Sequence, residues 1–312
     1  MAISLTALDP TSYLSHLCHT SADRAWIETN CYVDVWIELV HACKLDVSAM
    51  MGMTLGVDFE GDQWTFFKPS HEALRALYGI QVEELTVWQD VVRNAAVQVA
   101  RGRVVLTEAD SFFLPDTAAT DYQRNHVKTT IGIVRIAAAS CDYFHNGGFW
   151  RVSGEDFAGL FAPVVMPWYC EFAKLDNAET RPLQRLRDVA LGLLRETLRY
   201  RPSVNPFIAF NRHLVDDGVT KNGLAEWHKY AFVSLRQCGA AFELAAMHLQ
   251  WLARDLAPLA AHTLAISASC KSLILKGARA ASAGRGLDAG EAAASMAEHW
   301  ETLMTELDAR LA

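Results

Sequence analysis

The spacing of apolar and polar residues changes near residue 175. Before that point, segments with apolar residues three and four positions apart are followed by short runs rich in Val, Ile and Thr. The first pattern predicts helices and the second predicts strands. After residue 175 almost every segment has helical spacing, with breaks at 201–206, Pro258 and 282–290. The sequence therefore predicts an α+β domain over 1–175 and a helical domain over 176–312.

In the first half, a helix is predicted to begin after Asn30, a residue that often caps helices. Further helices are predicted over 71–80 and 83–102, the second ending on Gly102. Strands are predicted at 103–110, 126–136, 141–146 and 149–153, and the last three follow one another closely. Short connections between consecutive strands favour an antiparallel meander. In the second half, helices are predicted at 183–200, 224–256, 259–281 and 290–311, which would form a bundle.

Composition narrows the class of protein. The formal net charge of −8 does not favour nucleic-acid binding, which usually requires a basic face. The first ten residues lack a basic segment followed by an apolar one, so no signal peptide is predicted. Glu243, His248 and Arg254 interrupt the most apolar stretch, so no membrane span is predicted. Seven scattered cysteines indicate free thiols rather than disulfides. We therefore expect a cytoplasmic protein without a membrane or nucleic-acid partner.

Cys31 follows the predicted cap and would lie in the first turn of a helix. The positive end of the helix dipole favours a thiolate at this position. Asn30 and the first N–H groups of the helix are candidates for holding the oxyanion of a tetrahedral intermediate. The alternative is that Cys31 is an ordinary core thiol, one of seven cysteines.

His126 begins the most strand-like segment, and thiol catalysis needs an imidazole as base and later as acid. A third group should orient this ring. Asn146 ends the next strand, so antiparallel pairing would bring it near His126. Asp142 and His145 are alternatives, and Asn146 could also be a residue of the "HNGG" turn.

A helix-capping Cys, a His that opens a strand and an Asn or Asp after the next strand together resemble the papain-like cysteine fold. The stretch from "GRVVLTEADSFFLPDT" to "YFHNGGFWRVSGEDFAGLF" is more specific. It is similar to the N-terminal domain of the butirosin-type acyltransferases, which take an acyl group from a carrier-protein thioester. The family motif falls on Asp110, His126 and Asn146, where the family has Asp in the third position. Asp110 is therefore a further candidate for substrate contact.

The whole chain, including "DFEGDQWTFFKP", "RPSVNPF" and "WHKYAFVSLRQCGAAFELAA", also resembles a bacterial family of proteins of unknown function. Members of that family tend to be encoded near amino acid:carrier-protein ligases. The two resemblances imply an acyl or aminoacyl carrier protein as partner, bearing a phosphopantetheine thioester. They also imply a small-molecule acceptor and no cofactor in the chain itself.

Other candidate residues lie outside this pattern. Gln63, within "DFEGDQWTFFKP", could donate to an oxyanion, although a plain connection is the simpler interpretation. Arg236 and Glu243 share one face of an apolar helix and could pair. Arg236 is thus a further candidate for substrate contact, although interdomain packing is the simpler interpretation. "HLCHT" (16–20) has metal-binding residue types without a second cluster, so no metal site is predicted.

A charged helix face offers a docking surface for a carrier protein. Helical spacing places four arginines on one face: Arg181, Arg185, Arg195 and Arg199. A solvated stripe is the simpler interpretation, but carrier proteins are acidic and would need a local basic surface. We therefore expect a thiol-dependent acyltransferase acting through a Cys31 acyl-enzyme. The alternatives are a cysteine peptidase or amidase, and a non-catalytic binding partner of a ligase–carrier system.

Overall fold

The computed structural model describes residues 3, 5–88, 90–161, 169–216 and 219–311. The chain forms two compact units, each assembled from separate stretches of sequence. The sheet unit comprises Met1–Ser21, Asn30–Val47 and Ser70–Arg181, and the helical unit comprises Ala22–Thr29, Ser48–Pro69 and Pro182–Ala312. Two segments of the first half, Ala22–Thr29 and Ser48–Pro69, thus belong to the helical unit. The predicted division at a single boundary near residue 175 does not describe this arrangement.

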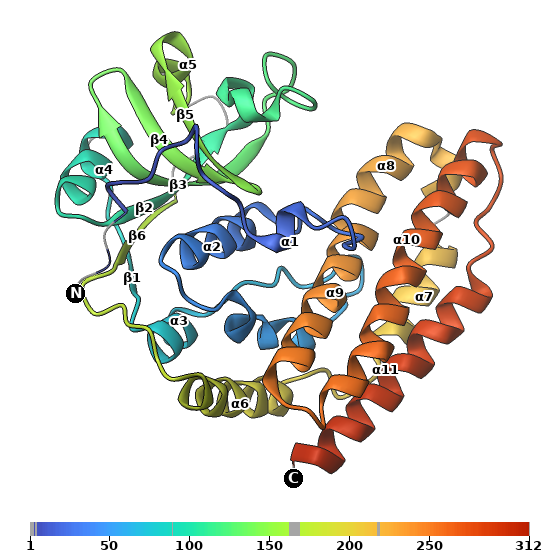
Figure 1. The fold of residues 1–312 in the computed structure, drawn as a ribbon. Coiled ribbons are helices and arrows are strands. Elements are labelled where there is room, and N and C mark those ends of the chain that lie inside the picture. The colour runs from blue at the N-terminus through green and yellow to red at the C-terminus, as the bar shows by residue number, and fades with distance from the viewer. Residues whose placement is uncertain (1–2, 4, 89, 162–168, 217–218, 312) are drawn as a thin grey trace. The chain divides into compact units, whose positions relative to one another are not determined.

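The sheet unit is built on an antiparallel sheet whose described strands lie in the order β1-β6-β2-β3-β4-β5 (Figure 1). Three consecutive strands, β3 to β5, form the predicted meander. The strands are β1 Gln81–Glu84, β2 Val104–Asp110, β3 Lys128–Ala137, β4 Ser140–His145, β5 Gly148–Ser153 and β6 Cys170–Lys174.

Helices cover both faces of this sheet. The helices of the unit are α1 Leu17–Thr20, α2 Cys31–Ala42, α3 His71–Tyr78, α4 Val91–Ala100 and α5 Gly154–Gly159, with 3₁₀ turns η2 Ser111–Phe113 and η3 Pro115–Thr117. On one face α2 packs on β3 and β4. A Cβ atom added to Gly132 would lie 2.8 Å from Cγ1 of Val35, so the glycine permits the close approach of α2. On the other face, α4 and α5 cover a core that contains Ile131, Ile133 and Tyr143.

The helical unit contains the longest helices of the chain. Its elements are α6 Leu183–Arg199, α7 Pro206–Asp216, η4 Val219–Asn222, α8 Leu224–Val233, α9 Leu235–Leu252, η5 Ala257–Leu259, α10 Ala260–Ser282 and α11 Gly290–Leu311, and η1 Val47–Gly56 begins at its border. Helix α10 lies between α9 and α11 and packs on both (Figure 1). Trp227 of α8 is fully buried against Gly277 of α10.

The α+β class is confirmed, as are the four predicted strands and the start of α2 after Asn30. The prediction of one helix over 83–102 is wrong. Residues 81–84 pair with β6 as strand β1, and α4 begins only after Asp90, whose carboxylate accepts from the backbone N–H of Arg93. Strand β6 and helix α7 were not predicted, and the segment 224–256 divides into α8 and α9 at Ser234.

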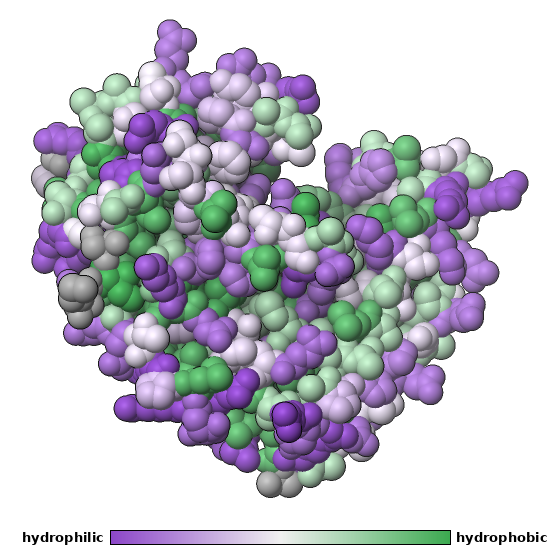
Figure 2. Space-filling view, viewed as in Figure 1, coloured by the Kyte–Doolittle hydropathy of each residue, from purple (hydrophilic) through white to green (hydrophobic). Residues whose placement is uncertain are grey.

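The described chain contains one stretch, Ala257–Ser282, that is long and apolar enough to cross a membrane by length and composition. This corrects the expectation that no stretch reaches that length. A core helix of a soluble protein passes the same test, and α10 packs against α8, α9 and α11. On the face shown in Figure 2, apolar residues are scattered among hydrophilic ones.

Candidate active site

Cys31 is the first residue of α2. The cap before it, Asn30, has extended backbone angles, and its Oδ1 accepts a hydrogen bond of 2.9 Å from the N–H of Val33. Cys31 is partly exposed, whereas the other six cysteines are buried. Burial raises the pKa of Cys43 and Cys141 to about 12, so these two remain thiols at neutral pH. The candidate nucleophile is therefore the one accessible cysteine among the described residues.

His126 is held by a carboxylate from the neighbouring strand. Its Nδ1 lies 2.6 Å from Oδ2 of Asp110, and the other carboxylate oxygen accepts from the N–H of Phe112 at 3.0 Å. The ring stacks on Phe112 with centroids 4.3 Å apart and planes 9° apart. The side chain of Asp110 is buried, while that of His126 is 47% exposed. Since a carboxylate only accepts, Nδ1 carries the proton and Nε2 is the nitrogen available as a base.

Contacts along α2 place its N-terminus and the start of β3 at the same end of the sheet. Val35, in the second turn of α2, lies over Gly132 of β3. At the other end of the helix, Cys43 lines a pocket with residues 176–181, which follow the end of β6. Because β6 and β3 both run antiparallel to β2, the end of β6 is also the end of β3. Cys31 and His126 therefore lie toward the same end of the sheet.

Asp110 also lies on the face of the sheet that α2 covers. Asp110 pairs with Lys128 and Leu106 pairs with Gly132, so side chains at alternate positions place Asp110 on the face that α2 covers. No hydrogen bond joins Sγ of Cys31 to His126 among the described residues. Hydrogen bonds between catalytic groups are often long in the free enzyme and shorten when substrate binds.

The partner of His126 is Asp110, not Asn146. Asn146 has φ 45° and forms the β4–β5 turn with Gly147, which is the turn role suggested by the "HNGG" motif. Asp142 is also engaged elsewhere, since Arg151 Nε and Arg135 Nε donate to it at 2.5 and 2.7 Å. Burial alone would raise the pKa of Asp142, but these hydrogen bonds hold it below its usual range.

A buried carboxylate on β6 fixes the first turn of α2, and sequence reasoning did not find it. Glu171 is fully buried, and Tyr32, the residue after Cys31, donates its hydroxyl to it at 2.5 Å. Tyr169 donates to the other oxygen at 2.8 Å, and His71 Nε2 lies 3.2 Å from that oxygen. The strand β6 itself was not predicted, so no pattern in the sequence linked Glu171 to Tyr32.

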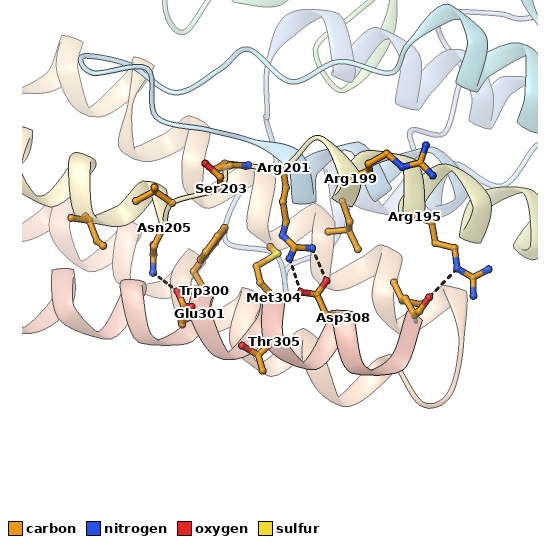
Figure 3. Close-up of a pocket in the computed structure, with 15 residues that line it drawn as sticks. Arg195, Arg199, Arg201, Ser203, Asn205, Trp300, Glu301, Met304, Thr305 and Asp308 are labelled. Atoms are coloured by element: carbon orange, nitrogen blue, oxygen red, sulfur yellow. Dashed lines mark hydrogen bonds and ion pairs between the residues drawn. The ribbon is translucent and has the colours of Figure 1, made fainter.

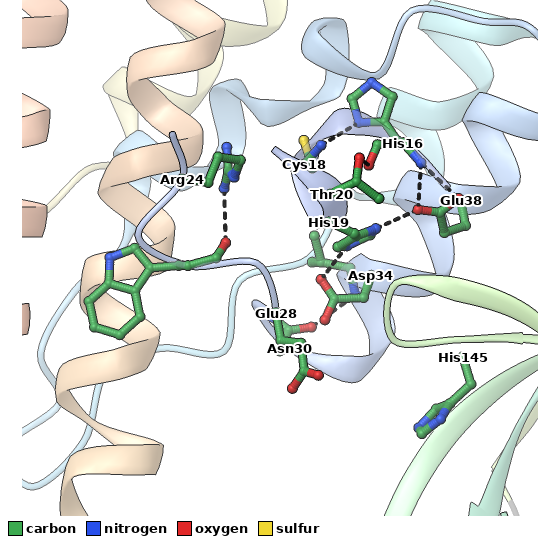
Figure 4. Close-up of polar contacts among 12 residues, drawn as sticks. His16, Cys18, His19, Thr20, Arg24, Glu28, Asn30, Asp34, Glu38 and His145 are labelled. Carbon is green, nitrogen blue, oxygen red and sulfur yellow. Dashed lines mark hydrogen bonds and ion pairs between the residues drawn. The ribbon is translucent and has the colours of Figure 1, made fainter. Parts of the chain in front are cut away.

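A second buried polar cluster joins the N-terminal segment to α2. Figure 4 shows His19 between Asp34 and Glu38, with Nε2 and Nδ1 at 3.2 and 2.5 Å from their oxygens. Tyr13 donates its hydroxyl to Glu38 at 2.5 Å, and the backbone N–H of His16 donates at 3.0 Å. Burial opposes the charged ring, but hydrogen bonds to the two carboxylates outweigh it and raise the pKa of His19 to about 9.

This cluster predicts a pH-dependent stability. The folded-state pKa of His19 lies above its unfolded value of 6.5, so the stabilisation is complete below pH 6.5 and is lost as the pH rises to about 9. Relative to His19→Gln, the wild type should lose roughly 3 kcal/mol of its free energy of unfolding across this window. Urea denaturation at pH 6 and pH 9.5 measures the difference. His228→Gln, at an exposed histidine, should keep the wild-type dependence. A His19→Gln variant with that same dependence would contradict the assignment.

Comparison with protein families places both halves of the chain. A family model described as the DUF1839 N-terminal domain matches residues 15–175, and one described as the DUF1839 C-terminal domain matches residues 183–309. The chain belongs to the DUF1839 family. No curated protein matches it. Within this DUF1839 chain, Cys31, Asp110 and His126 all fall in the N-terminal match.

The remaining candidate residues of the DUF1839 chain lie in its helical unit, except Arg181, which is the last residue of the sheet unit. Gln63 is exposed in a short hairpin where Phe59 pairs with Trp64. The predicted pair of Arg236 and Glu243 does not form. Glu243 instead binds Arg24 at 3.0 Å and accepts from the backbone N–H of Ala25 at 2.7 Å. Arg236 lies over the ring of Phe232, 3.9 Å from its centroid.

Only three of the four arginines predicted to share one helix face lie on α6. Arg181 precedes α6, belongs to the sheet unit, and donates to the carbonyl of Ala76. Arg185, Arg195 and Arg199 are exposed on α6. Arg199 pairs with Glu196 at 3.1 Å.

A pocket of about 810 Å³ lies beside these arginines, between the end of α6, the segment 201–208 and α11 (Figure 3). Arg195 and Arg199 line it, and Arg201 binds Asp308 through both carboxylate oxygens at 2.7 and 2.6 Å. Trp300 and Met304 supply apolar surface. Arg201 is paired within the pocket, whereas Arg195 and Arg199 belong both to the pocket lining and to the exposed face of α6.

The described residues contain no group of three or more His, Cys, Asp or Glu side chains arranged to hold a metal ion. In "HLCHT", His16 accepts through Nδ1 from the N–H of Cys18, and His19 belongs to the carboxylate cluster.

Proposed function

We propose that this protein transfers an acyl or aminoacyl group from a carrier-protein thioester to a small amine or hydroxyl acceptor, through an acyl-enzyme on Cys31. One observation carries the proposal. The accessible thiol that begins α2 lies at the same end of the sheet as His126, whose Nδ1 is bound to the buried Asp110. A helix-end thiol, an imidazole at a strand start and an orienting carboxylate together resemble the papain-like cysteine enzymes.

In the first half-reaction, His126 Nε2 accepts the proton of the Cys31 thiol. The sulfur then attacks the thioester carbonyl carbon, and the carbon–sulfur bond to the phosphopantetheine arm breaks. The departing thiolate takes the proton back from His126, which leaves the acyl group on Cys31. The backbone N–H of Cys31, at the start of α2, is suited to hold the oxyanion, while that of Val33 is bound to Oδ1 of Asn30.

In the second half-reaction, His126 takes a proton from the acceptor amine or hydroxyl as it attacks the Cys31 thioester. The new amide or ester forms, and the proton returns to the sulfur of Cys31. Asp110 keeps the proton on Nδ1 in both steps, so Nε2 remains the base. If water replaces the acceptor, the same residues give a hydrolase.

The partner in this proposal is an acidic carrier protein. The exposed arginines of α6, at 185, 195 and 199, are the surface that we propose for its docking. Charge complementarity of this kind acts mainly on the association rate and is screened over about 8 Å at physiological salt.

Intact-mass spectrometry tests the proposal. The protein is mixed with a carrier protein loaded with an aminoacyl thioester, and its mass should rise by that of the aminoacyl group. Peptide mapping should find the group on Cys31. Adding an amine acceptor should remove it and yield the aminoacyl product.

Release by water alone, at the same rate with and without acceptors, would make the protein a hydrolase. Absence of any adduct across a panel of aminoacyl and acyl carriers would contradict covalent catalysis. An adduct mapped to another cysteine would contradict the choice of nucleophile.

A further inference from the structure

A second chain of acid, imidazole and hydroxyl lies within the sheet unit. Nδ1 of His145 is 2.6 Å from Oδ2 of Asp116, and Nε2 of His145 is 2.8 Å from Oγ1 of Thr129. The other oxygen of Asp116 accepts the hydroxyl of Tyr143 at 2.5 Å. Because the carboxylate only accepts, Nδ1 of His145 carries a proton, and Nε2 of the same ring is hydrogen-bonded to the Thr129 hydroxyl.

This chain is not placed for attack on a substrate. The side chains of His145 and Asp116 are each only 2% exposed, and Thr129 is buried. Alternation along β3 puts Thr129 on the face of Ile131 and Ile133, opposite the face that α2 covers. A buried hydroxyl on the far face from Cys31 has neither access to substrate nor a route to the thiol.

The same three residues connect the segment that supplies His126 to the strand that follows it. That segment, residues 111–127, leaves the sheet after Asp110 and returns to it at β3. Its two ends are joined by the bond from Ser111 N–H to the Val127 carbonyl at 2.9 Å. Asp116 lies midway along it, and Thr129 lies three residues after His126. His145, at the end of β4, therefore holds the middle of the segment and the strand that follows it.

The position of the His126 ring depends on that segment. Phe112, on which the ring stacks, belongs to it, and Asp110 immediately precedes it. Leu114, fully buried in the core, and Tyr122, whose hydroxyl donates to Asp156 at 2.7 Å, are its further anchors. The Asp116–His145–Thr129 chain reaches by hydrogen bonds from the segment to the start of β3.

We propose that Asp116, His145 and Thr129 are positioning residues that set the orientation of His126 against Asp110. The proposal rests on the proposed function only for its kinetic readout. If the chain is cut, the segment and β3 can shift relative to each other, and Nε2 of His126 moves out of line with the thiol. Small displacements of a catalytic group are known to lower rates strongly even when binding is unchanged.

Thr129→Val tests the chain, because valine has the same shape and lacks the hydroxyl. Thr130→Val is the matched control, since Thr130 is the next residue on β3 and its hydroxyl has no hydrogen bond within the described part of the chain. In Thr129→Val the rate of acyl-enzyme formation should fall about ten- to a hundred-fold with an unchanged half-saturating carrier concentration. In Thr130→Val the rate should stay within two-fold of wild type.

A spectroscopic readout decides the proposal without activity. In ¹⁵N-histidine-labelled protein, the Nδ1 proton of His126, assigned through its loss in His126→Asn, should move upfield in Thr129→Val and stay in place in Thr130→Val. Asp116→Asn, which cuts the chain at its other end, should repeat the shift if Thr129→Val does not fold. A His145 signal that moves while the His126 signal stays would overturn the positioning role. If the wild type forms no acyl-enzyme but the His126 signal still shifts in Thr129→Val, the proposed function alone would be refuted.

Discussion

Replacing Cys31 with alanine is expected to abolish the acyl adduct and the transfer product, with the fold intact. The reason is chemical, because the thiol of Cys31 is the atom that takes the acyl group. Cys43→Ala is the matched control, since Cys43 caps the other end of the same helix and is buried. It should retain the adduct. Intact mass after incubation with the loaded carrier separates the two variants, and circular dichroism checks their folding.

Replacing Asp110, which orients His126, should lower the rate of acylation without abolishing it. Asp110→Asn removes the charge that holds the Nδ1 proton, so the rate of acylation should fall by roughly 10²–10⁴. Asn146→Gly is the comparison, because glycine tolerates the left-handed backbone of the turn, and its rate should remain near that of wild type. Single-turnover kinetics with the loaded carrier measures both. A large loss in Asn146→Gly with a normal rate in Asp110→Asn would restore the original assignment of the third residue.

Gly277→Ala should cause one of the largest losses of stability available to a single methyl group. A Cβ atom at this position would lie 1.9 Å from Cζ2 and 2.3 Å from Cε2 of Trp227. The indole cannot move away easily, since it is fully buried and its Nε1 donates to the carbonyl of Ile274 at 3.1 Å. We expect the free energy of unfolding to fall by about 3 kcal/mol or more.

Gly192→Ala, at another glycine inside a helix, should have the opposite effect on stability. Gly192 lies inside α6 and is exposed, and a Cβ atom there meets nothing within 4 Å. Alanine should therefore raise the free energy of unfolding by about 0.5–1 kcal/mol through its higher helix propensity. Urea denaturation of both variants checks the pair. Similar effects of the two substitutions would show that the contact of Gly277 with Trp227 is not tight.

Local patterns were sufficient to predict where α2 and the central strands lie. The cap at Asn30, the Val- and Ile-rich run of β3 and the "HNGG" turn are each determined by neighbouring residues, and all three appear in the structure. Strand β1 was missed because residues 81–84 continue an apparently helical pattern. Only pairing with β6, about 90 positions later in the chain, makes that segment extended.

The candidate site could be predicted only in part for a similar reason. Cys31 and His126 are marked by what surrounds them in sequence, but the partner of His126 depends on which strand lies beside β3. Strands β2 and β4 both lie beside β3, and each brings a polar residue to the end of the sheet where His126 lies. The face decides between them, since Asp110 lies on the side of α2 and Asn146 turns away in a hairpin. A single sequence does not contain that information.

The interleaving of the two units has a consequence for the order in which the chain can fold. Trp26 is part of the helical unit, where its indole N–H donates to Ser267, a residue 241 positions later. The neighbouring backbone N–H groups bind Glu243 of α9. During synthesis on the ribosome, this segment emerges before α9 and α10, and these partners are missing until both helices have been made. A protein released after residue 175 would keep Trp26, Met51 and Leu55 without the helices that bury them, and would be a target for chaperones rather than a free-standing domain.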